Sequence, residues 1–174
     1  MKSKVIKLEL NEKSIDKAIE QVNQYKFNLD GKCFELQNRV ADRLKWLARS
    51  GFSVAIADAL STGEYRTANV SVETKPGDIT IVFTSGADAI WCEFGTGVYY
   101  NGTAGTSPHP KGVELGFTIG GYGQGKGKRQ AWCFYQGGQL HWTHGIPASM
   151  PMYKAFETVI YEIADIAKEV FAND

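Results

Sequence analysis

The clearest pattern of hydrophobic and polar positions lies near the C-terminus. Apolar residues recur there at helical spacing, at Tyr153, Phe156, Val159, Ile160, Ile163, Ile166, Ala167, Val170 and Phe171. The opposite side carries Glu157, Glu162, Asp165, Lys168 and Glu169. Such a stripe predicts one long amphipathic helix that packs one face on a sheet. Pro147 excludes helix before it, Pro151 suits the first helical turn, and Ser149 is the expected cap.

Alternating positions predict two β-hairpins. In the first, apolar residues between 70 and 83 alternate with polar ones around Pro76-Gly77, the signature of a type II turn. In the second, aromatic runs flank Gly137-Gly138, which supply the positive φ angles of a primed turn. Residues 5–10 alternate in the same way and predict a half-buried N-terminal strand.

Helical spacing predicts two helices between these strands. Ser14 is the expected cap of the first, whose stripe consists of Ile15, Ala18, Ile19 and Val22. A break is expected at residues 28–31, which include Gly31. The second helix has Cys33, Leu36, Val40, Leu44 and Leu47 on its inner face. Gly51 is expected to end or bend it, and residues 54–60 continue as a short helix.

The whole chain, residues 1–174, therefore reads as one α+β domain. We expect an antiparallel sheet built from the N-terminal strand and the two hairpins, packed by the N-terminal helices and the long C-terminal helix. A single helical turn around residues 90–94, with Gly95 as its C-cap, is expected to pack under the sheet. Residues 98–130 lose periodicity and form a glycine-rich irregular insertion, which is typical of a functional or mobile segment.

Composition narrows the class of protein. The chain has a net charge of zero and a pI of about 6.8, which argues against a large basic face for duplex nucleic acid. Cys33, Cys92 and Cys133 are few and widely spaced, as expected of reduced thiols. Neither a signal peptide nor a membrane span is predicted. We expect a soluble intracellular product.

The glycine-rich run at residues 120–126 resembles a phosphate-binding loop in its glycines and Lys126. Gly127 stands where that loop needs Ser or Thr, and no helix pattern follows. The favoured interpretation is a flexible loop with three cations, Lys126, Lys128 and Arg129. These cations are candidates for contact with phosphate or with an acidic neighbour.

Candidate reactive groups are sparse. His141 and His144, with His109 as a third ligand, suggest a metal site, but residues three apart on a strand point to opposite faces. Glu93 is either a buried acid or a carboxylate that caps local amides or meets a neighbouring subunit's cation. Nothing resembles a nucleophile elbow around the cysteines. We expect no cofactor, no metal and no enzymatic activity.

Trp46 lies off the inner stripe of its predicted helix, near the polar side. An exposed large aromatic often marks an interface. A position at the rim of the core is the alternative, and the sequence leaves both open.

Two passages together resemble the small tail-completion or neck proteins of long-tailed bacteriophages. Ile90-Trp91-Cys92-Glu93-Phe94-Gly95-Thr96-Gly97 is similar to their aromatic, Glu-Phe-Gly-Thr-Gly segment. In the second passage an aromatic hairpin leads into a helix start through Gly145, Pro147, Ala148, Pro151, Met152, Ala155, Phe156 and Glu157. Met150 and Met152 depart from the family pattern, and the loop from Val98 to Arg129 is longer than expected.

The resemblance implies a structural, head–tail joining virion protein, a minor tail component. Copies would form a homo-oligomeric ring, expected to be a hexamer, against the phage connector or neck and the tail-tube or terminator proteins. Incidental contact with phage DNA is a further expectation, as is a location in the virion tail or neck, and in the bacterial host cytoplasm during assembly. The alternatives are a small metal-dependent hydrolase using His141 and His144 and a nucleic-acid or carbohydrate binding module.

Overall fold

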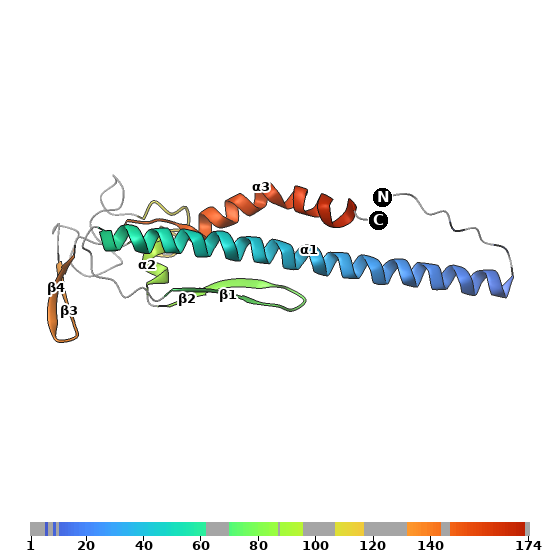
Figure 1. Cartoon of the computed structure of the whole chain (residues 1–174), viewed down its shortest axis with the longest axis horizontal. Helices are drawn as coiled ribbons and strands as arrows, with labels where there is room; N and C mark the ends of the chain where they lie inside the picture. Colours follow the sequence, from blue (N-terminus) through green and yellow to red (C-terminus); the bar gives the residue numbers. More distant parts are fainter. Residues whose placement is uncertain are drawn as a thin grey trace.

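The structure is a computed structural model that describes residues 6, 9, 11–61, 70–86, 88–95, 107–116, 132–143 and 147–172. Figure 1 shows its elements in order: α1 (Glu12–Ser61), β1 (Ser71–Lys75), β2 (Ile81–Ser85), α2 (Ala89–Phe94), β3 (Trp132–Gln136), β4 (Gln139–Thr143) and α3 (Pro151–Ala172). The α+β class is confirmed. None of the described helices has a stretch long and apolar enough to cross a lipid bilayer.

Helix α1 is a single helix of 50 residues, so the predicted break at residues 28–31 is wrong. The segment contains no proline, and one glycine costs a helix only about 1 kcal/mol, which good helix formers on both sides offset. Gly51 does not end the helix either. A Cβ at Gly51 would come within 2.9 Å of the Pro151 Cβ, so this glycine lets α3 approach α1 closely.

The cap of α1 is Asn11 and not Ser14. The backbone N–H of Ser14 donates to Asn11 Oδ1 at 2.8 Å, and Ser14 Oγ accepts from the N–H of Glu9 at 2.9 Å. Asn11 thus satisfies one amide of the first turn, and Ser14 satisfies the amide of Glu9 just before the helix.

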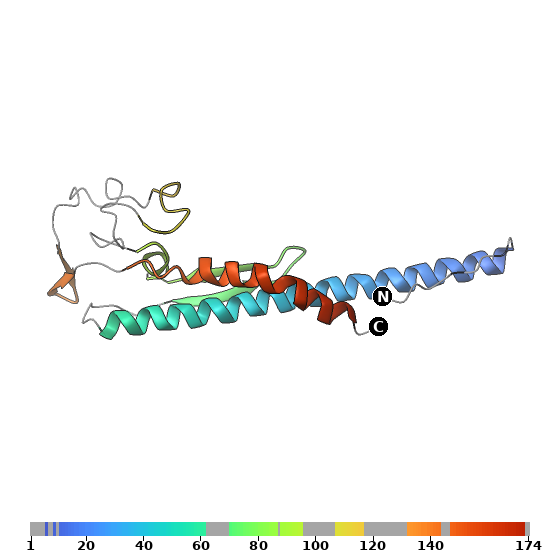
Figure 2. The ribbon, with the colours of Figure 1, turned by 90° about the horizontal axis from the view of Figure 1, so that it is seen from above.

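Helix α3 runs antiparallel to α1 along its C-terminal half (Figures 1 and 2). Arg43 binds Glu162 through two hydrogen bonds of 2.7 Å each, and Lys32 lies over the ring of Phe171 near the end of α3. The core forms where α1, α3, α2 and the first hairpin meet; its buried residues are Ala48, Phe52, Ala55, Val72, Ala89, Cys92 and Ala155. Small residues predominate there, which allows close approach of the elements.

Both predicted hairpins are present. β1 pairs antiparallel with β2, with Val72 opposite Thr84, and the completely buried Val72 packs against α1. β3 pairs antiparallel with β4 through Gly137 and Gly138, whose φ angles of 59° and 80° are those of a primed turn.

The expected single sheet is not formed in the described part of the chain. There the strands make two separate two-stranded sheets, β1–β2 and β3–β4. Most of the predicted N-terminal strand lies outside the described residues, and its two described members, Ile6 and Glu9, are not in a strand. In Figure 1 the β3–β4 hairpin projects from the end of the molecule where α1 finishes.

The N-terminal part of α1 extends past the end of α3 (Figures 1 and 2). We call residues 12–29 the arm. Its apolar residues are largely exposed, among them Ile15, Ile19, Val22, Tyr25 and Phe27.

Candidate functional site

The carboxylate of Glu93 lies buried at the C-terminal end of α2 and caps the start of α3. Its Oε2 accepts the backbone N–H of Met152 at 2.8 Å, and its Oε1 accepts that of Tyr153 at 2.9 Å. The first amides of a helix lack intrahelical partners, and a negative charge is favourable at that end of the helix dipole. Of the readings that the sequence left open for Glu93, amide capping is therefore the one observed.

The other groups at the start of α3 complete this arrangement. Pro151 has no N–H to satisfy, which suits the first helical position. The N–H of Lys154 donates to the carbonyl of Met150 at 3.0 Å. Ser149 is therefore not the cap: Met150, at a positive φ of 53°, directly precedes the helix, and Glu93 takes the amides.

His109 approaches Glu93 from a separate loop. Its Nε2 lies 3.2 Å from Glu93 Oε1, and its Nδ1 accepts the backbone N–H of Lys111 at 3.0 Å. Because Nδ1 is an acceptor, the ring proton is on Nε2, which donates to the carboxylate. The buried imidazole also lies between the rings of Phe94 and Tyr153, at centroid distances of 4.4 and 5.2 Å.

The loop that carries His109 is fastened to the end of α2. Ser107 Oγ donates to the carbonyl of Phe94 at 2.5 Å and accepts the N–H of His109 at 3.2 Å. Gly112 is packed closely, since a Cβ there would meet Ser107 Cβ at 2.8 Å and the His109 carbonyl oxygen at 2.9 Å. Gly95, with φ of 78°, caps α2 as predicted, through its N–H to the Trp91 carbonyl.

The carbonyl of Cys92 forms a second link to the chain before α3. It accepts the N–H of Ser149 at 2.9 Å and that of Met150 at 3.3 Å. The junction between α2, the 107–112 loop and the start of α3, centred on Glu93, is hereafter the Glu93 junction.

Several of the motif residues meet at this junction, namely Glu93, Phe94, Gly95 and Pro151. Pro147 precedes it in an exposed position, and Phe156 is about half-exposed on α3. Thr96, Gly97 and Gly145 lie outside the described residues, as do the cations Lys126, Lys128 and Arg129. His109 and Ser107 are the members whose role at this junction the sequence did not reveal.

Trp46 is 60% exposed on α1. The guanidinium of Arg43 lies 5.0 Å from its ring centroid, a cation–π distance. The same guanidinium binds Glu162, so the tryptophan flanks the ion pair between α1 and α3.

The described part of the chain holds no group of three or more His, Cys, Asp or Glu side chains that could bind a metal ion. His141 is half-buried on β4 opposite Phe134, whereas His144 lies outside the described residues. Both ring nitrogens of His109 and both oxygens of Glu93 are engaged in hydrogen bonds. The chemistry of the junction is therefore that of holding three segments together.

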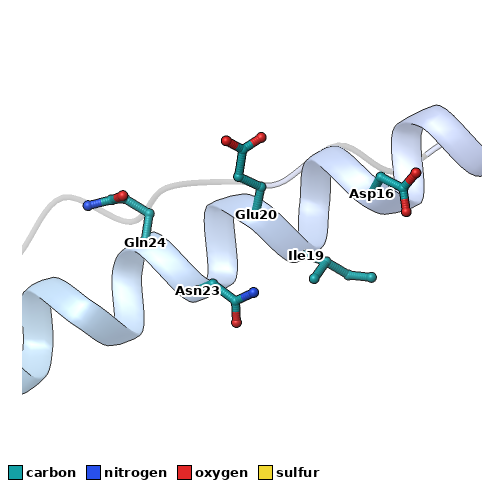
Figure 3. A pocket seen from close by; sticks show the side chains of 5 residues that line it. All are labelled: Asp16, Ile19, Glu20, Asn23 and Gln24. Atoms are coloured by element: carbon teal, nitrogen blue, oxygen red, sulfur yellow. The ribbon is translucent and has the colours of Figure 1, made fainter.

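A hollow of about 380 Å³ lies on the arm, lined by Asp16, Ile19, Glu20, Asn23 and Gln24 (Figure 3). All five lining residues belong to one helix, and Figure 3 shows their side chains pointing in different directions. They do not converge on a common point, so they do not form a small-molecule site.

Comparison of the chain with protein-family models, with curated proteins and with solved structures found no match.

Proposed function

We propose that this protein is a structural subunit of a tailed phage or prophage virion, a tail-completion or neck protein that forms a ring at the head–tail junction. The observation that carries the proposal is the Glu93 junction. The two passages that resemble the family are far apart in the sequence, and they are joined by hydrogen bonds from Met152 and Tyr153 to Glu93.

This contact explains why the two passages would occur together. The glutamate of one passage supplies the cap of the helix that the other passage begins, so either loses its structural role without the other. We infer that this capped, proline-initiated helix is a scaffold for assembly contacts.

Exposed apolar surface gives further support. Large apolar side chains are exposed on α1 at Trp46, on the arm, and on α3 at Phe156, Ile160 and Ile163. Exposed apolar side chains that cluster on a surface typically mark contacts with other proteins.

Deletion of the gene from the phage or prophage that encodes the chain tests the proposal. We expect DNA-filled heads and separate tails by electron microscopy, and a plasmid-borne copy should restore joined, infectious particles. Mass spectrometry of purified particles should detect the protein. Normal particles after the deletion, or particles that lack the protein, would contradict the proposal.

A further inference from the structure

We propose that the β3–β4 hairpins of neighbouring copies pair edge to edge, so that β4 of one copy lies beside β3 of the next and the ring of copies closes a β-barrel. The inference rests on the ring-forming part of the proposed function and identifies the strands that would join its subunits.

The β3–β4 hairpin has two strand edges that no other strand of the described chain covers. Its sheet consists of these two strands, and the hairpin projects from the end of the molecule where α1 finishes (Figure 1). A hairpin that stands alone is marginally stable in water, and a sheet needs three or more strands or packing against a helix to be stable by itself. A further strand beside either edge would therefore stabilise the hairpin.

The register of the hairpin shows which backbone groups point outward. Gln136 and Gln139 are the pair that closes the two-residue turn, and such a pair is hydrogen-bonded. Hydrogen-bonded and non-hydrogen-bonded pairs alternate along an antiparallel ladder. The next pair, Tyr135 and Leu140, therefore directs its N–H and C=O groups to the two outer edges, and the pair two residues further from the turn repeats this arrangement.

The edges of this hairpin lack the features that keep exposed strands from pairing. Proteins usually shield such edges with charged residues, proline or bulges. Residues 132–143 contain no Asp, Glu, Lys, Arg or Pro, and the two strands pair residue by residue without a bulge. The first hairpin differs, because it carries Glu73 and Lys75 on β1 and its Val72 is buried against α1. The contrast identifies β3 and β4 as the strands suited to pairing.

A further strand satisfies these edges better than other classes of ligand do. The hydrocarbon of a lipid bilayer would leave the outward N–H and C=O groups without partners. Nucleic acid needs cations for its phosphates, and the hairpin has none. A sugar would stack on Tyr135 and Trp142, which are 76% and 66% exposed, but would leave the backbone edges uncovered. An added β-strand supplies main-chain hydrogen bonds along a whole edge.

A second copy of the chain is the partner that covers both edges with one repeated contact. β3 and β4 have five residues each and run antiparallel. A rotation about an axis roughly along the strands therefore brings β4 of one copy beside β3 of the next, with equal length and in antiparallel direction. A strand from a different protein would cover one edge and leave the other exposed, whereas closure of the ring covers every edge.

The same pairing also covers part of the exposed apolar surface of the hairpin. Tyr135, Leu140 and Trp142 lie on one face and are between 45% and 76% exposed. Neighbouring strands of a sheet direct side chains at one level to the same face. Edge pairing thus brings these side chains of successive copies into contact.

Two single substitutions test the pairing. Leu140→Lys places a charge on the β4 edge and Tyr135→Glu places one on the β3 edge; both side chains are exposed in the single chain, so the fold should be retained. Circular dichroism checks the fold, and light scattering after size exclusion gives the oligomeric state. Each substitution should weaken self-association at least about 10-fold. Ile81→Lys is the matched control, because Ile81 is exposed on β2 of the first hairpin, and it should assemble like the wild type.

Mixing the two variants identifies which edges meet. In a 1:1 mixture the positive β4 edge of the Leu140→Lys protein meets the negative β3 edge of the Tyr135→Glu protein, and the other contact is unchanged. Alternating copies should therefore restore the assembly. Pairing of β4 with β4 would leave the Tyr135→Glu protein assembling normally and would overturn the proposal.

Hydrogen exchange tests the backbone ladder itself. The N–H of Trp142 points to the outer edge of β4, so it should exchange at least about 100-fold faster in the Leu140→Lys protein than in the wild-type assembly. Protection of this amide in the monomer would show that the chain covers its own edge, and would overturn the proposal.

Three further results would overturn the pairing. They are a wild-type protein that stays monomeric at about 100 μM, a Leu140→Lys variant that assembles normally, and a mixture that restores no assembly. Particles that contain the protein and tolerate Leu140→Lys would overturn the pairing and leave the proposed function standing. Pairing in solution by a protein that particles lack would do the reverse.

Discussion

At the scale of single residues, Glu93 links three segments of the described chain. Its buried carboxylate accepts hydrogen bonds from two amides of α3 and lies within hydrogen-bonding distance of His109. A carboxylate only accepts hydrogen bonds, and the three groups that face it here all donate. A side chain that donates a hydrogen bond would therefore leave one of these donors without an acceptor.

The substitution Glu93→Gln should therefore destabilise the protein while nearly preserving size. The glutamine amide directs a donor at groups that are themselves donors and removes the charge from the helix start. We expect the free energy of unfolding to fall by about 2 kcal/mol, measured by urea denaturation followed by circular dichroism.

Glu114→Gln is the matched control, because Glu114 forms an exposed ion pair with Lys111. That pair is solvent-exposed, and its loss should change stability by less than about 0.5 kcal/mol. Equal effects of the two substitutions would contradict the role given to Glu93.

At the scale of secondary-structure elements, the antiparallel contact between α1 and α3 depends on close approach at one end and on charge in the middle. Gly51 permits the approach to Pro151. Further along, Arg43 and Glu162 are joined by two hydrogen bonds, and Arg39 lies 3.4 Å from Glu169.

Alanine substitutions at two glycines of α1 should change the free energy of unfolding in opposite directions. Gly51→Ala forces α3 away and should lower the free energy of unfolding by about 1–3 kcal/mol. Gly31→Ala meets nothing within 4 Å on an exposed helix, and should raise it by about 0.5–1 kcal/mol. Chemical denaturation of both variants measures this; a stabilising Gly51→Ala would contradict the packing.

The Arg43–Glu162 pair makes stability depend on pH. The hydrogen bond from Arg43 lowers the pKa of the Glu162 carboxyl below its ordinary value of 4.5, and the bond to Glu162 raises the pKa of Arg43. The unfolded state then binds more protons in acid, so the contribution is full above pH 4.5 and is lost as pH falls through the lowered pKa.

Thermal midpoints of the wild type and Glu162→Gln, compared between neutral pH and about pH 2, test this coupling. At neutral pH the wild type should have a higher thermal midpoint than Glu162→Gln. This difference between the two proteins should vanish in acid. Asp165→Asn is the control, since Asp165 pairs with Lys168 within α3 and both side chains are about three-quarters exposed. The thermal midpoints of the wild type and Asp165→Asn should differ little at either pH, because exposed ion pairs contribute little to stability.

At the scale of the whole molecule, the core residues of α1 are packed by other elements, whereas the apolar residues of the arm are largely exposed. Core residues of α1 such as Phe52 and Ala55 are packed by α3 and the first hairpin, whereas Ile19 and Val22 are largely exposed. A helix of about 18 residues without packing is marginal in water.

Hydrogen exchange should reveal this difference. At low protein concentration, amides around Val22 should exchange at least about 100-fold faster than those around Phe52. Equal protection of arm and core in the monomer would contradict the assignment of the arm as an unpacked helix.

The sequence by itself determined much of the local structure, although not the helix boundaries and caps corrected above. The periodicity of α3, Pro151 at its first turn, both hairpins and the cap at Gly95 follow from patterns within a few residues, and all are present. The sequence also singled out Glu93 as either a buried acid or a cap. These features were predictable because spacing and turn geometry depend on near neighbours.

Only the tertiary structure decided how these pieces combine. Glu93 replaces Ser149 as the cap of α3, Gly51 serves packing instead of ending α1, and the hairpins remain separate sheets in the described chain. His109 joins Glu93 through a loop whose sequence indicated no such partner. Each outcome depends on contacts between residues distant in the chain, and local propensities of about 1 kcal/mol do not fix which of those contacts form.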